Sequence, residues 1–278
     1  MDRGLITGAA SGIGAALAER LTADGMRLAL LDRVPAQAPG AVVRVADVRD
    51  ATAVTAAVDE MAAELGGLDV AFVNAGIGNM GPAHLMDAQA AEDNLEINLL
   101  GAWRTTRAVL PHLIASRGHL LLNASLSAVI PAPGLAAYSA SKAGVEALGR
   151  AIRPELAHRG VTVGLTYYGF LATPLVNEVL GNDAYKAVRA GVPWPFSKTY
   201  PVEPAIEATV RGIDRRSRVV AYPGWIRAAM AARGILDSRL VEATLRSSGP
   251  RLEEGYRREA ERVGVEAAAR GPRERARI

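Results

Sequence analysis

The chain has 278 residues, half of them hydrophobic, and a formal net charge of +3. This length suits one large wound α/β domain, and so small a charge excludes the dense basic surface of a nucleic-acid-binding protein. The absence of cysteine excludes disulfides, thiolate catalysis and zinc–thiolate sites.

The N-terminus enters an apolar strand-like run almost at once, without the hydrophobic stretch of a signal peptide. No apolar run approaches the roughly 20 residues that a membrane-spanning helix needs. We therefore expect a soluble cytoplasmic protein. The four histidines lack metal-ligand spacing, so no metal site is expected.

Short apolar runs alternate with longer alanine-rich segments through most of the chain. The runs bounded by Gly, Asp or Asn, as strands buried on both faces are, cover residues 4–7, 27–32, 41–47, 68–76, 118–125 and 161–167. The segments with helical spacing between them are Gly14–Ala23, Ala51–Leu65, Leu95–Ala115 and Ser139–His158. This alternation predicts an α/β fold, a doubly wound parallel sheet in three layers, or Rossmann fold.

The pattern loosens from Thr173, where Pro and Gly interrupt scattered large apolar residues. Residues 174–203 are interpreted as a substrate lid of loops and short helices. Glu203–Arg215 then predicts a helix and residues 217–224 a last strand. We expect one domain over residues 1–224 and a C-terminal helical extension, residues 225–278, packed on it. The mixed Arg and Glu of this extension are typical of a solvated helix face.

The first predicted strand runs into a glycine-rich turn with Gly8, Gly12 and Gly14. Glycines let the backbone approach a ligand closely, and the N-terminus of the next helix offers free N–H groups to a pyrophosphate. Ser11 and Ile13 belong to the same turn. The spacing is not the strict G-x-G-x-x-G, and a turn that only starts a helix is the alternative.

Asp32 closes the second predicted strand, about 20 residues after the glycines, where an acid can accept hydrogen bonds from an adenosine ribose. An acid here repels a 2′-phosphate, and Ser11 is not basic, so NAD is favoured over NADP. Arg33 keeps NADP open, since a guanidinium can hold that phosphate. A helix cap is the alternative role for Asp32.

Tyr138 and Lys142 lie four residues apart on one predicted helix. A free tyrosine has a pKa of about 10 and is a poor base at neutral pH. A lysine ammonium one helical turn away favours the phenolate and so lowers that pKa. The pair is interpreted as a proton donor with its activator, and an ordinary surface pair is the alternative.

In these motifs and their order the chain resembles the short-chain dehydrogenase/reductase family over residues 3–220. The motifs are the turn Thr7–Gly14, the pair Asp47-Val48, the run Asn74-Ala75-Gly76, Asn98 in a helix, Ser125 thirteen residues before the tyrosine, and Tyr138 with Lys142. The resemblance implies reversible hydride transfer between a nicotinamide and a carbonyl carbon.

The resemblance also implies residue roles. Tyr138 is the general acid/base, Lys142 activates it and holds the nicotinamide ribose, and Ser125, rather than its neighbour Ser127, hydrogen-bonds the substrate oxygen. Asn98 holds a proton-relay water chain, unless it only satisfies a buried carbonyl. The implied cofactor contacts are Asp47 and Val48 at the adenine, Asn74, Ala75 and Gly76 beside its ribose, and Gly169, Leu171 and Thr173 at the nicotinamide.

Two stretches depart from the family pattern. Tyr168 stands where the family has proline, and its ring either lines the substrate pocket or only packs. The long C-terminal tail puts the family's common tetramer in doubt and leaves a homodimer through the helices of Asn98 and Tyr138 favoured. For Trp225–Leu236, packing over the cleft or a partner subunit is favoured over a membrane surface.

The substrate is expected to be an apolar secondary alcohol or ketone, because burying a charge among apolar lid residues would go uncompensated. These residues are Leu175, Val176, Val179, Leu180, Val192, Trp194 and Phe196, with Met80 and Val129 on the same wall. Two alternatives stay open: a nucleotide-binding sensor without turnover, and an isomerase, epimerase or dehydratase of the same fold.

Overall fold

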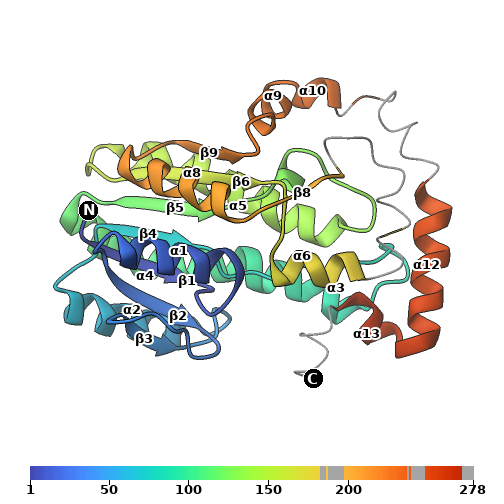
Figure 1. Ribbon diagram of the computed structural model, residues 1–278, viewed down its shortest axis with the longest axis horizontal. Coiled ribbons are helices and arrows are strands. Elements are labelled where there is room, and N and C mark those ends of the chain that lie inside the picture. Colours follow the sequence, from blue (N-terminus) through green and yellow to red (C-terminus); the bar gives the residue numbers. More distant parts are fainter. Residues whose placement is uncertain (182–185, 187–196, 237, 239–247, 271–278) are drawn as a thin grey trace.

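A parallel seven-stranded sheet forms the centre of the protein (Figure 1), with strand order β3-β2-β1-β4-β5-β6-β9. The computed structural model describes residues 1–181, 186, 197–236, 238 and 248–270. The strands are β1 (Arg3–Thr7), β2 (Arg27–Asp32), β3 (Val42–Val45), β4 (Val70–Val73), β5 (His119–Asn123), β6 (Thr162–Tyr168) and β9 (Val219–Tyr222). The predicted α/β class is confirmed.

Successive side chains along a strand point to opposite faces of the sheet and pack into two separate hydrophobic cores. In β5, Leu120 and Leu122 join one core and Leu121 the other. The first core is covered by α2 (Ala51–Leu65), α4 (Gly101–Ser116) and α5 (Ala136–Ala157), and the second by α1 (Gly12–Ala23) and α8 (Glu203–Asp214). The sheet is therefore apolar on both faces, as the continuous apolar runs predicted.

The predicted helix over Leu95–Ala115 begins earlier in the structure. Asp87 accepts a hydrogen bond of 2.8 Å from the backbone N–H of Ala90 and so caps α3 (Ala88–Leu95). A π-helical turn, η1 (Glu96–Leu100), joins α3 to α4. The start was missed because this stretch is mainly alanine and polar residues, without an apolar stripe.

The last third of the described chain is mostly helical. After the short β7 (Phe170–Leu171) come α6 (Pro174–Gly181) and β8 (Thr199–Tyr200), which pairs with β7 in a two-stranded sheet that was not predicted. The remaining elements are α9 (Ile226–Ala231), α10 (Arg233–Leu236), α12 (Ser248–Val263) and α13 (Val265–Ala269). No helix in the described ranges has both the length and the apolar character needed to cross a membrane.

His119, the first residue of β5, makes the folded state sensitive to acid. Burial lowers the pKa of this imidazole from 6.5 to about 4, and its Nδ1 lies 2.9 Å from the Thr162 hydroxyl. Between pH 6.5 and pH 4 the unfolded chain binds a proton that the folded chain does not. The free energy of unfolding should therefore fall by about 3 kcal/mol as the pH drops through this window.

Urea denaturation of the wild type and of His119→Gln at pH 7 and pH 4 measures this term. The variant should lose less stability on acidification, by about 3 kcal/mol, while His84→Gln, whose side chain is 65% exposed, should behave like the wild type. Equal acid sensitivity in wild type and His119→Gln would contradict the assignment.

Candidate active site

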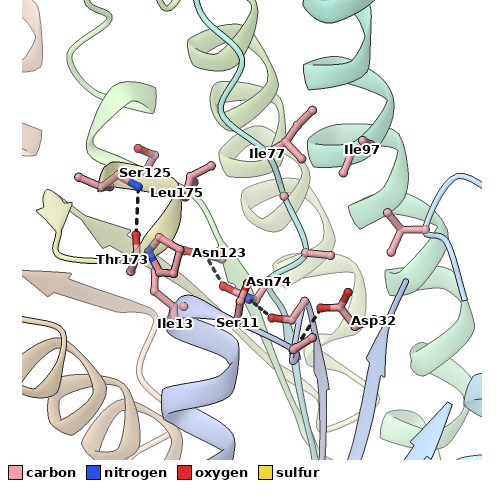
Figure 2. Close-up of a pocket in the computed structure, with 18 of the residues that line it drawn as sticks. Ser11, Ile13, Asp32, Asn74, Ile77, Ile97, Asn123, Ser125, Thr173 and Leu175 are labelled. Carbon is pink, nitrogen blue, oxygen red and sulfur yellow. Dashed lines mark hydrogen bonds between the residues drawn. The ribbon is translucent and has the colours of Figure 1, made fainter. Parts of the chain in front are cut away.

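A cavity of about 330 Å³ lies at the carboxyl ends of five neighbouring strands (Figure 2). Gly8 follows β1, Asp32 ends β2, Asn74 follows β4, Ser125 follows β5 and Gly169 follows β6. Parallel strands bring such residues to one edge of the sheet, which is the usual ligand site of wound α/β folds. Every predicted catalytic and cofactor-binding residue lines this cavity except Gly14 and Asn98.

The glycine-rich turn is built for close approach of a ligand. Gly8 and Gly12 have φ angles of 67° and 56°, which favour glycine. A Cβ built on Gly14 would lie 2.1 Å from the carbonyl oxygen of Gly8, so only glycine fits there. Ser11 starts α1 without a side-chain cap among the described contacts, which leaves the first N–H groups of α1 to an anion at the cavity.

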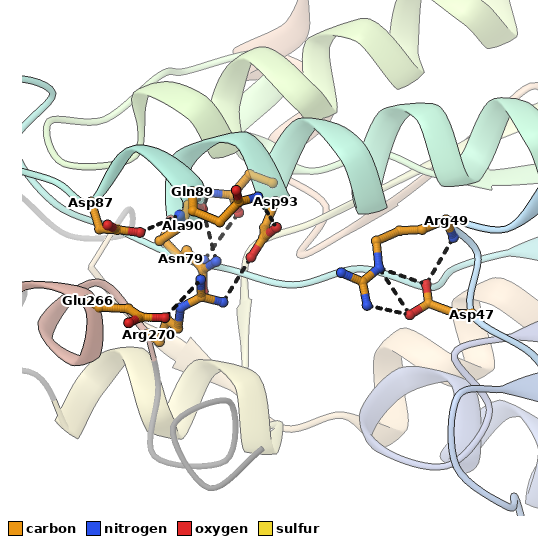
Figure 3. Close-up of polar contacts among 10 residues, drawn as sticks. Asp47, Arg49, Asn79, Asp87, Gln89, Ala90, Asp93, Glu266 and Arg270 are labelled. Atoms are coloured by element: carbon orange, nitrogen blue, oxygen red, sulfur yellow. Dashed lines mark hydrogen bonds and ion pairs between the residues drawn. The ribbon is translucent and has the colours of Figure 1, made fainter. Parts of the chain in front are cut away.

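The part of the cavity beside β2 contains two acids with different surroundings. One oxygen of Asp32 accepts a 2.9 Å hydrogen bond from the Ala10 N–H, which fixes the carboxylate beside the turn. Asp47 is held by Arg49 through bonds of 2.6 to 3.1 Å (Figure 3), and this guanidinium lowers the pKa of the Asp47 carboxyl. Arg33 also lines the cavity. Asp32 and Arg33, the two charged residues that bear on the choice between NAD and NADP, therefore both face it.

Asn74 ties together the ends of three strands. Its side-chain N–H donates to the Thr7 carbonyl at 3.1 Å, and its side-chain oxygen accepts from Asn123 at 2.8 Å. Asn123 in turn accepts from the Thr166 hydroxyl at 2.8 Å, and its backbone carbonyl accepts from Lys142 Nζ at 2.9 Å. Asn123 was missed in the sequence, where the only signal was an amide at the end of an apolar run.

Tyr138 and Lys142 lie in the first two turns of α5 and share one wall of the cavity. The Lys142 Nζ is 6.0 Å from the centre of the Tyr138 ring. Burial lowers the pKa of the Lys142 ammonium to about 8 and raises the pKa of the Tyr138 phenol, an effect that a hydrogen bond with Ser125 partly offsets. The expected net lowering of the phenol pKa is therefore not met, because burial outweighs the effect expected of the ammonium.

The Ser125 hydroxyl accepts a 3.1 Å hydrogen bond from the Ser127 N–H at the start of the short helix η2 (Leu126–Ala128). Ser125 lines the cavity beside Tyr138, whereas Ser127 is not among the lining residues of the described chain. The geometry therefore favours Ser125 over Ser127, as the spacing did. A phenol that keeps its proton at neutral pH, next to this hydroxyl, is suited to give a proton to a carbonyl oxygen.

Asn98 does not line the cavity but hydrogen-bonds the backbone of Ile77, a residue that does. Its side-chain oxygen accepts from the Ile77 N–H at 2.8 Å, and its side-chain nitrogen donates to the Ile77 carbonyl and to the Ser141 hydroxyl, both at 3.0 Å. Asn94, one turn earlier, binds both backbone groups of Asn79 in the same way. These contacts match the simpler interpretation of Asn98, and its proton-relay role stays a prediction.

The Tyr168 ring packs in the second core, where its hydroxyl forms a hydrogen bond with the Thr209 hydroxyl of α8. Burial raises the pKa of this phenol to about 12. Although Tyr168 contributes to the cavity wall, its polar end is occupied by α8. Tyr168 therefore both lines the cavity and packs in the core, and packing is its main role.

The lid is described only in part. Leu175 and Val176 of α6 line the cavity, and Thr173 accepts a 3.3 Å hydrogen bond from the Val176 N–H. Val192, Trp194 and Phe196 of the predicted lid lie outside the described residues, as do the side chains of Val179 and Leu180. Met80 and Val129 are buried but are not among the described lining residues.

The described residues contain no group of three or more His, Cys, Asp or Glu side chains placed to hold a metal ion.

Trp225–Leu236 packs on the domain, since Ile226 is buried and Arg233 donates to the Ala128 carbonyl and to Glu146. This stretch therefore contacts the loop that follows Ser125 as well as α5.

Known proteins resemble this chain in sequence and share its fold. A family model for short chain dehydrogenases matches residues 4–183. An uncharacterized oxidoreductase of Myxococcus xanthus is 32% identical over 254 residues, which cover 87% of this chain and 95% of that protein. The crystal structure of levodione reductase matches with a TM-score of 0.72 at 28% identity, over 82% of this chain and 98% of that one. A 3-ketoacyl-(acyl-carrier-protein) reductase from Brucella melitensis, complexed with NADH, matches with a TM-score of 0.70 at 25% identity, over 80% and 96%.

Proposed function

Because the chain belongs to the short-chain dehydrogenase family, whose members are oxidoreductases acting on CH–OH groups with a nicotinamide cofactor, we propose that it interconverts an apolar secondary alcohol and its ketone with NAD. One observation carries this proposal: a single cavity joins the glycine turn and Asp32 at one end to Ser125, Tyr138 and Lys142 at the other. That order suits a dinucleotide whose nicotinamide meets the substrate at the proton donor.

The residues present fit such a cofactor. The uncapped start of α1 would hold the pyrophosphate, the Asp32 carboxylate the adenosine ribose, and the Lys142 ammonium the nicotinamide ribose. A Cβ on Gly8 would lie 2.8 Å from the Cα of Ala75, so the turn and the loop after β4 already touch. When bound, the nicotinamide supplies hydride to a carbonyl carbon or accepts it from an alcohol.

The protein's side chains donate or accept the proton and orient the substrate carbonyl. In the reducing direction Tyr138 gives its phenolic proton to the carbonyl oxygen, and the Ser125 hydroxyl donates a hydrogen bond to the same oxygen. The Lys142 ammonium, held on the Asn123 carbonyl at 2.9 Å, favours the phenolate that remains. Apolar side chains that line the cavity, Ile77, Ile97, Leu171, Leu175 and Val176, support an apolar substrate.

Fluorescence titration of the protein with NADH and with NADPH tests the cofactor. NADH should bind at least tenfold more tightly, because the Asp32 carboxylate repels a 2′-phosphate. Asp32→Ala should weaken NADH binding about tenfold and bring the two affinities close together. Asp2→Ala, at a side chain that is 95% exposed, is the matched control and should change neither affinity. Tighter binding of NADPH by the wild type would mean that Arg33 outweighs Asp32, and binding of neither would refute the proposed activity.

We also propose a homodimer that uses the helices carrying Asn98 and Tyr138. On that side of the domain Leu95, Leu100 and Trp103 are unusually exposed for large apolar residues. An apolar surface of this kind is typical of a protein contact.

A further inference from the structure

The C-terminal arm, defined here as α12 and α13 with Arg270, lies outside residues 4–183 matched by the family model. It runs beside α3 at the same end of the molecule as α6 (Figure 1). An apolar cluster joins it to the domain, formed by Leu252, Tyr256, Ala268 and Ala269 of the arm with Ala90, Leu85 and Met86. The arm therefore docks through a core of its own.

A buried ion pair fixes the end of the arm (Figure 3). Arg270 Nη1 lies 2.8 Å from the Asp93 carboxylate of α3, and the two side chains are only 9% and 10% exposed. Gln89 donates a further 3.0 Å hydrogen bond to Asp93, and Glu266 lies 3.7 Å from Arg270. Loss of one partner of a buried ion pair leaves an uncompensated charge, which disfavours the docked arrangement.

The docked arm holds the chain that follows β4. The Ala269 carbonyl accepts a 3.0 Å hydrogen bond from the Met80 N–H, and the next N–H, that of Gly81, donates to the Gly134 carbonyl at 2.9 Å. A Cβ built on Gly81 would lie 2.7 Å from the Tyr256 ring, and one on Gly134 3.1 Å from Leu252. The arm thus touches both loops with no room for an added methyl group at Gly81.

These contacts bear on the start of α5, which carries Tyr138 in its first turn. Leu135, the residue before α5, provides no side-chain cap within the described chain, and an uncapped helix end frays easily. Met80 and Leu135 are buried together, with Tyr138 and Phe170 packed against them. The cluster around the phenol is therefore assembled from a loop that the arm holds in place.

We infer that the C-terminal arm is a positioning element for the proton donor: by holding Met80 and the turn before α5, it fixes the Tyr138 ring toward the cavity. The inference rests on the proposed function, since it concerns the same proton transfer. Arg270 and Leu252 act through other residues, since neither is among the described residues that line the cavity.

Arg270→Met tests the arm, because it leaves the Asp93 carboxylate buried without its cation. Peroxide oxidation followed by peptide mass spectrometry measures how fast each methionine is oxidised and so whether the arm is docked over Met80. Met80 is 3% exposed and should be oxidised at least tenfold faster in the variant, whereas Met61, a fully buried residue of α2, should stay protected. The double variant Asp93→Leu with Arg270→Met replaces the ion pair by apolar side chains and should restore protection of Met80.

The kinetic readout separates positioning from a merely structural role. Arg270→Met should lower kcat about tenfold while the Kd for NADH changes less than twofold, and the double variant should regain most of kcat. Leu252→Ala, which keeps the ion pair but removes the contact over Gly134, should lower kcat in the same way. Val265→Ala, at an arm residue that is 51% exposed, is the matched control and should leave kcat unchanged.

The outcomes are distinct. Faster oxidation of Met80 with an unchanged kcat would overturn the inference, as would protection of Met80 in Arg270→Met. A loss of NADH affinity in parallel with kcat would also overturn it, because the arm would then support the whole cavity. A wild type that turned over no ketone would refute the proposed function itself, and the inference with it.

Discussion

Tyr138→Phe should lower turnover by about a thousandfold or more while leaving NADH affinity within about twofold of the wild type. The change removes one oxygen and keeps the ring, so the packing against Met80 and Leu135 should survive. The proton for the carbonyl oxygen would then have to come from water, and the hydrogen bond between Tyr138 and Ser125 would be lost. Single-turnover reduction of a ketone, with NADH binding measured separately, checks both halves of this expectation.

The matched control for this variant is Tyr167→Phe. Tyr167 is a tyrosine of β6 that is buried in the first core and does not line the cavity within the described residues. The Tyr167→Phe variant should have a turnover within about twofold of the wild type, since the hydroxyl that it lacks lies away from the reacting groups. Wild-type rates in Tyr138→Phe would contradict the assignment of the proton donor.

The sequence predicted the fold well because the signals for this fold are local. A continuous apolar run bounded by Gly, Asp or Asn predicts a strand buried on both faces, and β1, β2 and β5 are such runs. Many of the cavity residues were predictable for the same reason. Gly8, Asp32, Asn74, Ser125 and Gly169 each lie at or just after the end of a strand, and the carboxyl ends of parallel strands meet at one edge of the sheet.

What the sequence did not predict depends on contacts between distant residues. Asn123 connects Asn74, Thr166 and Lys142, and none of these pairings leaves a periodic pattern. The direction of the Tyr168 ring, toward Thr209 of α8, likewise depends on which helix covers β6. The docking of Arg270 on Asp93 spans 177 positions, far beyond any local signal.

The pKa of Tyr138 is the clearest case of a local argument overruled by packing. One helical turn between Tyr138 and Lys142 suggested a lowered phenol pKa. Burial in α5 raises the pKa of the phenol instead and lowers that of the ammonium. Both shifts come from desolvation, which follows from the whole fold and not from the spacing of two residues.

Lys142→Met should reduce turnover by about a hundredfold or more and at the same time stabilise the protein near neutral pH. Turnover falls because the ammonium no longer favours the phenolate or holds the nicotinamide ribose. Stability rises because the wild type keeps a charged ammonium buried, 4% exposed. Removing the ammonium also leaves the Asn123 carbonyl without its 2.9 Å hydrogen bond, so the net gain should be about 1 to 2 kcal/mol.

The pH dependence of that gain identifies its cause. Burial lowers the pKa of Lys142 from 10.5 to about 8, so between pH 8 and pH 10.5 the unfolded chain binds a proton that the folded chain does not. Wild-type stability from this group therefore rises with pH across that window, by as much as about 3 kcal/mol. Urea denaturation at pH 7 and pH 10 should show the advantage of Lys142→Met shrinking at the higher pH, whereas Lys198→Met, at an exposed lysine, should show no such change. An advantage that stayed constant with pH would mean that the ammonium is not the destabilising group, and turnover that survived in Lys142→Met would remove it from the proton transfer.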